Sequence, residues 1–146
     1  TLDQVETRDN LRVVSDIGSR LPIYCTSQGK VFLAHMSRTS AEALLRAQHM
    51  TQFTPHTITD LTALMQEIDL CRANGYAIEN GEYKIGLRSI SAPVYTVEGK
   101  ARYTVGVIGM FRSTRSDEFL AAVEQVCATA SMISTALGYR KTEELL

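Results

Sequence analysis

The chain has 146 residues, of which 45% are apolar and 21% charged, and its formal net charge is −1. This length suits one domain with a sizeable core. The near-neutral charge excludes a strongly basic surface that would grip nucleic acid by itself. We find no apolar run near the roughly 20 residues of a membrane-spanning helix, and no signal peptide at the start. The sequence therefore predicts a single globular domain without a membrane partner.

The first residues predict that the chain is part of a longer protein. It begins at Thr1 without a Met, and Leu2–Glu6 already alternates as a strand does. Removal of a tag, or processing, is the alternative.

Three cysteines, Cys25, Cys71 and Cys127, form an odd and widely spaced set. This number favours a reducing cytoplasm over a disulfide framework. No CxxC or HExxH motif occurs in the sequence, so we expect neither a structural zinc site nor a metal cofactor.

The N-terminal half combines extended segments with helices. Leu2–Glu6 and Leu11–Ser15 are predicted strands around a polar turn. A short helix follows over Gly29–Met36, with Ser27 as its N-cap, and a second begins at the capping-box pattern Thr39–Glu42.

A third helix opens at Thr59–Asp60 and ends at Gly75, with an apolar face at helical spacing. The period then changes to that of strands. Tyr76–Glu79 is a short strand, and Arg88–Tyr95 with Ala101–Arg112 forms an antiparallel hairpin.

The last predicted helix begins at Ser116 and ends at Gly138, and its roughly 31 Å would cross a whole sheet. Its apolar residues at helical spacing are Phe119, Leu120, Val123, Val126, Cys127, Ala130, Ile133 and Leu137. Strands, helices, a hairpin and a long helix together predict an α+β domain with an antiparallel sheet.

Catalysis has two weak candidates. Cys25 precedes a predicted helix, where a thiolate is stabilised, but a small residue packing at a strand end explains it as well. Glu79 and Glu82 are placed as an acid–base pair, although nothing in the sequence fixes their separation. We therefore predict no enzyme activity.

An anion site is the stronger prediction. The polar segment Thr26–Lys30 lies at a helix N-terminus, where amides and the helix dipole attract negative charge, and Gly29 permits a close backbone approach. The alternative is that Ser27 is a plain helix cap.

A surface facing this site is predicted on the hairpin. One face of Tyr103–Phe111 carries Gly106, which leaves room above the sheet, and Ser89 and Ser91 share one face of the neighbouring strand. Such a face beneath a helix N-terminus outlines a pocket for a small anion. The alternative is that Gly106 only admits close helix packing.

Several segments, in this order, resemble the C-terminal effector-binding domain of the IclR (isocitrate lyase regulator) family of bacterial transcription factors. They span nearly the whole chain and comprise Leu2–Val5, Gly18–Pro22, Cys25–Lys30, Arg72–Ala77, Asn80–Tyr83, Gly86–Val94 and Val105–Gly109.

The resemblance implies a GAF-like domain over residues 1–146, a curved antiparallel β-sheet flanked by α-helices. It also implies that a further helix and strand, and a winged helix-turn-helix DNA-binding domain, precede Leu2 in the full-length protein. Operator DNA would then be bound only through that upstream domain.

The resemblance also implies an effector pocket. Backbone amides at Ser27 and Gln28 would hold a carboxylate, with Glu79, Ser89 and two last-strand positions completing the site, Gly106 and Ile108. Some relatives carry hydroxyl groups at those last two positions. Gly106 and Ile108 cannot supply them, so we expect a less polar pocket that prefers a longer or partly apolar acid.

The sequence therefore predicts a cytoplasmic, ligand-sensing domain of a transcriptional repressor or activator, working as a homodimer or homotetramer. Its partner would be a small carboxylate effector, with no cofactor. The alternative is a GAF-like oligomerisation module with a vestigial pocket, favoured by the apolar Gly106 and Ile108.

Overall fold

The structure is a computed structural model, and it describes residues 1–8, 13 and 17–140. The elements of the described chain are α1 (Ser27–Ala34), α2 (Arg38–Arg46), α3 (Leu61–Asn74), β1 (Ala77–Asn80), β2 (Arg88–Tyr95), β3 (Ala101–Gly109) and α4 (Asp117–Ala136). Their order confirms the predicted α+β class.

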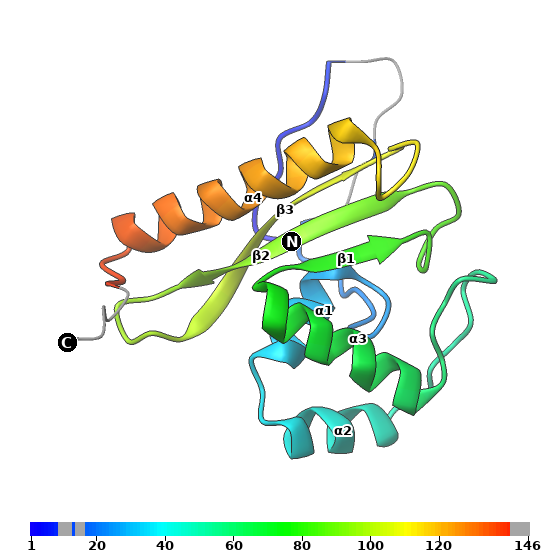
Figure 1. Ribbon diagram of the computed structural model, residues 1–146. Coiled ribbons are helices and arrows are strands. Elements are labelled where there is room, and N and C mark those ends of the chain that lie inside the picture. The colour runs from blue at the N-terminus through cyan, green and yellow to red at the C-terminus, as the bar shows by residue number, and fades with distance from the viewer. Residues whose placement is uncertain (9–12, 14–16, 141–146) are drawn as a thin grey trace.

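The strands form one antiparallel sheet in the order β1-β2-β3. Helices α1 and α3 lie on one side of the sheet and the long α4 crosses the other (Figure 1). Strand β2 is central, and six of its eight residues are buried.

Each side of the sheet has its own hydrophobic core. Between α4 and the sheet lie Ile90, Ala92, Val94, Phe119, Val123, Val126 and Ala130. On the opposite side, α1, α2 and α3 enclose a second cluster that includes Leu33, Leu45, Leu64 and Ile68. Alternation along β2 separates the two cores, because successive side chains of a strand point to opposite faces.

Helix α4 begins where the sequence predicts, since the Ser116 side chain caps it by accepting from the Phe119 amide. Three residues of its predicted apolar stripe are nevertheless exposed, namely Leu120, Ile133 and Leu137. A straight 20-residue helix touches a twisted sheet along a narrow line, which explains the narrower buried stripe.

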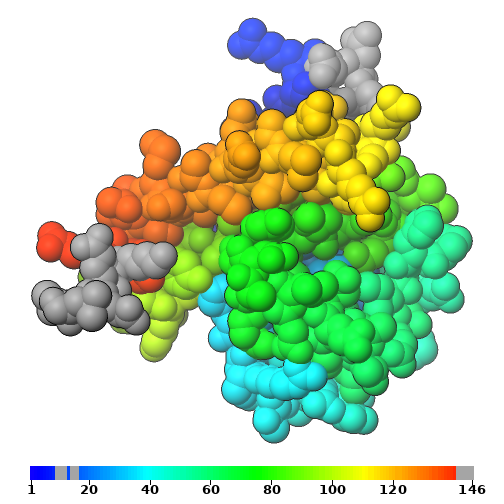
Figure 2. All heavy atoms as spheres, viewed as in Figure 1, coloured from blue at the N-terminus to red at the C-terminus, as the bar shows by residue number. Residues whose placement is uncertain are grey.

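By length and composition alone, α4 is apolar enough to cross a membrane, which corrects our reading that no such run exists. In the structure one of its faces packs against β2, as the core helix of a folded domain does. Figure 2 shows much of its outer side uncovered.

Two helix starts differ from the prediction. Thr26, not Ser27, caps α1, and the helix begins at Ser27, two residues earlier than predicted. Ser37, not Thr39, caps α2 by accepting from the Ser40 amide. In both places neighbouring Ser and Thr residues are equally good caps in sequence, and the backbone angles decide which one serves. The predicted ends of α3, Asp60 and Gly75, are confirmed.

The predicted N-terminal strand Leu2–Glu6 is wrong, because these residues form no strand. Leu2 and Val5 are both exposed, so the alternation there has no buried face to stabilise it. The predicted strand Leu11–Ser15 lies outside the described residues, apart from residue 13. Strand β3 ends at Gly109 rather than Arg112.

Candidate functional site

The site begins at the N-terminus of α1. Thr26 is extended, and its hydroxyl accepts from the Gly29 amide at 3.2 Å and donates to the Pro22 carbonyl at 2.8 Å. In the described part of the chain, the amides of Ser27 and Gln28 find no acceptor. Such amides, at the positive end of the helix dipole, can bind an anion.

The chain before α1 crosses the helix closely at Gly29. A Cβ there would overlap the carbonyl of Ile23, so only glycine fits. Gly29 therefore permits the close passage of the protein's own backbone, and its predicted role toward an anion stays a prediction.

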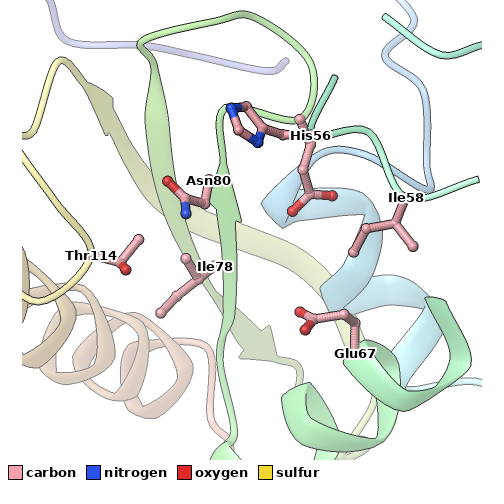
Figure 3. A pocket seen from close by; sticks show the side chains of 7 residues that line it. His56, Ile58, Glu67, Ile78, Asn80 and Thr114 are labelled. Atoms are coloured by element: carbon pink, nitrogen blue, oxygen red, sulfur yellow. The ribbon is translucent and has the colours of Figure 1, made fainter. Parts of the chain in front are cut away.

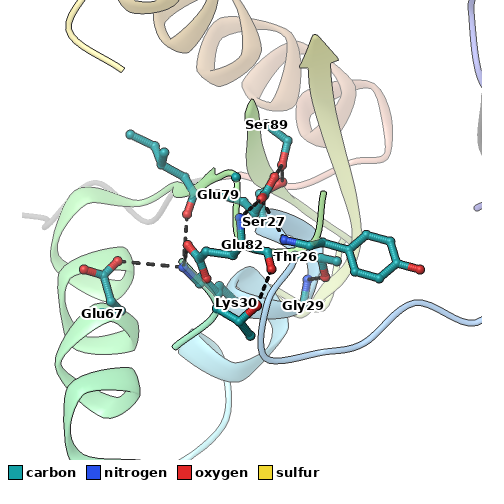
Figure 4. A network of polar contacts seen from close by, with 12 residues as sticks. Thr26, Ser27, Gly29, Lys30, Glu67, Glu79, Glu82 and Ser89 are labelled. Atoms are coloured by element: carbon teal, nitrogen blue, oxygen red, sulfur yellow. Dashed lines mark hydrogen bonds and ion pairs between the residues drawn. The ribbon is translucent and has the colours of Figure 1, made fainter. Parts of the chain in front are cut away.

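A chain of buried hydroxyls joins α1 to the sheet (Figure 4). Ser27 Oγ lies 2.8 Å from Ser91 Oγ and 2.8 Å from Ser89 Oγ. Ser89 Oγ in turn lies 3.2 Å from Glu79 Oε2. Each hydroxyl has one proton, so Ser89 can donate to Ser27 or to Glu79 but not to both at once, while either serine can donate in the Ser27–Ser91 contact.

Glu79 also fastens the segment that follows β1. Its Oε1 accepts the Glu82 amide at 2.5 Å and the Tyr83 amide at 3.2 Å. Both carboxylate oxygens are thus engaged by the protein. A ligand hydroxyl that reached Glu79 would have to share Oε2 with Ser89 or displace it.

Strand β3 brings the last two predicted residues beneath this network. Ile108 is paired with Ser89, and Gly106 with Ser91. A Cβ on Gly106 would overlap Ser91 Oγ and approach the Ile90 carbonyl to 2.5 Å. The room above Gly106 is therefore filled by the Ser91 hydroxyl, which bonds α1, rather than by the helix backbone.

The fold thus gathers Ser27, Glu79, Ser89, Gly106 and Ile108 around one network. Gln28 adjoins it, with its side-chain Oε1 3.4 Å from Ser27 Oγ. Ser91, noted in sequence only for the strand face it shares with Ser89, is its fourth polar member. The signal for Ser91 was its alternation with Ser89 along one strand.

Sequence reasoning missed an ion pair beside this network. Lys30 is fully buried, and its Nζ lies 2.6 Å from Glu82 Oε1 and 3.8 Å from Glu67 Oε2. It also donates to the Ile78 carbonyl at 3.3 Å. The available signal was a lysine among the apolar residues of α1, since a buried lysine requires an acidic partner.

The geometry speaks against the catalytic candidates. Burial, with a smaller contribution from the charges of Glu82 and Glu79, raises the pKa of Cys25 to about 12, so the thiolate is disfavoured. Glu79 and Glu82 do not face each other as an acid–base pair, because Glu79 bonds Ser89 and Glu82 bonds Lys30.

Residues 1–135 match the family described as bacterial transcriptional regulator IclR, C-terminal. The chain belongs to the IclR family. This confirms the resemblance and the α+β, GAF-like fold, and the relatives that match are named transcriptional regulators.

Similar proteins agree with this family. The HTH-type transcriptional repressor AllR of Escherichia coli K12 is 29% identical over 139 residues, 95% of this chain and 51% of the relative. A transcriptional regulator from Rhodococcus sp. RHA1 has a TM-score of 0.85 at 30% identity, covering 91% of this chain and 55% of the other. Thermotoga maritima IclR has a TM-score of 0.82 at 30% identity, covering 94% and 56%.

The chain spans about half the length of the curated relatives it matches. It therefore corresponds to the C-terminal regulatory domain of IclR-type transcriptional regulators, among them repressors.

Proposed function

We propose that this IclR-family domain senses a small organic acid and thereby modulates DNA binding by a full-length cytoplasmic protein. The effector carboxylate accepts the amides of Ser27 and Gln28, and Ser89 turns its one proton from Ser27 and Glu79 to the effector to donate a further hydrogen bond. The observation that carries this proposal is the pair of α1 amides without an acceptor in the described residues, set beside a buried chain of hydroxyls.

The residues around the carboxylate site determine which other chemical groups the effector can carry. The space above Gly106 is taken by Ser91, and Ile108 offers no polar side-chain atom, so an apolar group fits beside Ile108 better than a second polar one. Glu79 carries a negative charge beside Ser89, which repels a second carboxylate. A monocarboxylate with an apolar or hydroxylated body meets both conditions.

Regulation then requires two arrangements of the full-length protein that bind the effector with different affinity. In this proposal a winged helix-turn-helix domain, N-terminal to Leu2, binds the operator, and the domains associate as a homodimer or homotetramer. A further helix and strand ahead of Leu2 would complete the effector domain.

A second candidate function is that of an oligomerisation module with a vestigial pocket. One observation favours it, namely the apolar residues exposed on α4, which include Leu120, Met132 and Leu137. Exposed apolar clusters on a helix are typical of subunit interfaces.

Isothermal titration of the wild type with a panel of monocarboxylates and matched amides tests the effector proposal. Two variants isolate the amide contact: Ser27→Ala removes the hydroxyl alone, and Ser27→Pro removes the hydroxyl and the N–H. Proline is tolerated at the first helical position, and Thr26 already has the extended backbone it requires. We expect Ser27→Pro to bind an acid about tenfold more weakly than Ser27→Ala.

The proposal fails if no acid in the panel binds, or if the two variants bind equally. It also fails if binding survives Glu79→Ala combined with Ser89→Ala. Sedimentation velocity addresses the second candidate: a subunit mass unaffected by every acid, without any thermal shift, supports an oligomerisation module.

A further inference from the structure

A cavity of about 380 Å³ lies along β1 and is lined by none of the serines of the network. It is lined by His56, Ile58, Glu67, Ile78, Asn80, Glu82 and Thr114. Ile78 and Asn80 project from β1 on the side of Thr114, while Glu67 and Ile58 lie on the other side (Figure 3). Its volume falls within the range of pockets that hold small ligands.

This cavity is distinct from the proposed effector site. Its lining includes none of Ser27, Glu79 and Ser89, and Glu79 points to the face of β1 opposite Ile78 and Asn80. The two places touch only through Glu82, whose amide bonds Glu79 while its side chain lines the cavity.

The acidic side of the cavity contains a buried acceptor without a partner among the described residues. Lys30 donates to Glu82 Oε1 at 2.6 Å and to the Ile78 carbonyl at 3.3 Å, and its 3.8 Å distance to Glu67 Oε2 is that of an ion pair rather than a hydrogen bond. Glu82 is 5% exposed, and its second oxygen, Oε2, is buried without a hydrogen-bond partner in the described chain. An unpaired buried carboxylate oxygen is costly to the protein.

The charges beside the cavity also favour binding of a cation. Two carboxylates, Glu67 and Glu82, face one ammonium, Lys30, so the cluster carries one uncompensated negative charge. Burial disfavours the charged carboxylate of Glu82 and raises its pKa even beside Lys30. A second cation beside Glu82 would stabilise that charge.

We propose that this cavity binds a primary ammonium group on a short carbon chain. The ammonium donates to Glu82 and Glu67, and the chain packs against the side chains of Ile58 and Ile78. A carboxylate would meet negative charge here, and a neutral apolar molecule would leave Glu82 Oε2 unpaired.

An NMR titration of the ¹⁵N-labelled chain tests the proposal with three probes. n-Butylammonium carries the charge, the N–H donors and the carbon chain; tetramethylammonium lacks N–H donors, and 1-butanol lacks the charge. We expect saturable shifts of the Asn80 and Thr114 amides with n-butylammonium, weaker binding of tetramethylammonium and none of 1-butanol.

Glu82→Gln should weaken n-butylammonium binding about tenfold, because a charged acceptor is lost. This variant also removes the partner of buried Lys30, so circular dichroism must show that it folds. Glu67→Gln keeps that pair and changes a half-exposed residue, and it should weaken binding about threefold. Glu98→Gln, at an exposed acid with its own basic partners, is the matched control and should change nothing.

Equal binding of 1-butanol and n-butylammonium would overturn the proposal, since the cavity would then be merely apolar. Shifts that never saturate, or equal effects of Glu67→Gln and Glu98→Gln, would do the same. None of these outcomes bears on acid binding at Ser27.

Discussion

At the scale of single residues, Gly106 has a role that its place in the strand does not reveal. Ser91 turns its hydroxyl over Gly106 to reach Ser27, and both Ser91 Oγ and the Ile90 carbonyl occupy the space of a Cβ. The glycine therefore serves the contact between β2 and α1. Glycine suits this position because a Cβ would overlap Ser91 Oγ and the Ile90 carbonyl.

Gly106→Ala should lower the free energy of unfolding by about 2 kcal/mol, since a backbone carbonyl cannot move aside as a side chain can. Urea denaturation measures this. Gly109→Ala, in the same strand, is the control, because its Cβ would meet only the Phe111 ring at 3.3 Å. A loss no larger than that of Gly109→Ala would contradict the assigned role.

A second prediction concerns Cys25 and the stability of the fold at alkaline pH. Burial raises its folded-state pKa to about 12, above the roughly 8.5 of a thiol in the unfolded chain. The neutral thiol therefore stabilises the fold fully below pH ~8.5, and this contribution is lost as pH rises toward 12.

Between pH 8 and pH 10, the wild type should lose about 2 kcal/mol more stability than Cys25→Ala, which has no thiol to ionise. Chemical denaturation at both pH values measures the difference. Because the two proteins share every other titrating group, the contributions of those groups to the pH dependence cancel. Parallel pH curves for the two proteins would show that Cys25 ionises as an ordinary thiol.

At the scale of elements, α1 positions the candidate site through its first turn. Thr26 holds that turn with two hydrogen bonds of its hydroxyl, one to the Gly29 amide and one to the Pro22 carbonyl. The same geometry leaves the amides of Ser27 and Gln28 at the end of the helix. The cap thus supports both stability and the proposed carboxylate contact.

Thr26→Ala should cost about 1 kcal/mol of stability, and Thr26→Ser should restore most of it because the hydroxyl returns. Thermal or urea unfolding measures both. Thr39→Ala is the matched control, since Ser37 caps α2 and Thr39 is exposed inside the helix. An equal cost for Thr26→Ala and Thr39→Ala would refute the capping role.

At the scale of the whole molecule, β2 is the central strand between the two cores, and β1 adds Ala77 to one core and Ile78 to the other. Strand β2 pairs with β1 and β3, packs α4 on one face and receives α1 on the other. Breaking β2 therefore breaks both cores, whereas β1 and β3 each border the described sheet on one side only.

Hydrogen exchange should consequently be slowest in β2, at the amides of Ile90, Ala92 and Val94, with opening free energies close to that of global unfolding. Alternate amides of β3 should exchange much faster. Exchange resolved by NMR measures both sets. Equal protection along the whole of β3 would mean that its outer edge is paired in solution.

Much of the fold could be predicted from sequence, because its signals are local. Hydrophobic period separates α3 and α4 from the hairpin, and Gly75 and Gly99, both at positive φ, mark a helix end and a turn. The same kind of signal wrongly predicted a strand over Leu2–Glu6, since alternating residues form a stable strand only where one face is buried.

By itself, then, the sequence determined the class of the domain, its helices and the strands of its sheet, its family, and the polar and apolar residues offered to a ligand. Only the tertiary structure decided which of them meet. The Lys30–Glu82 pair joins residues 52 positions apart, and the Ser27–Ser91 contact joins residues 64 apart. Such contacts depend on how α1 docks against the sheet, which no local period encodes.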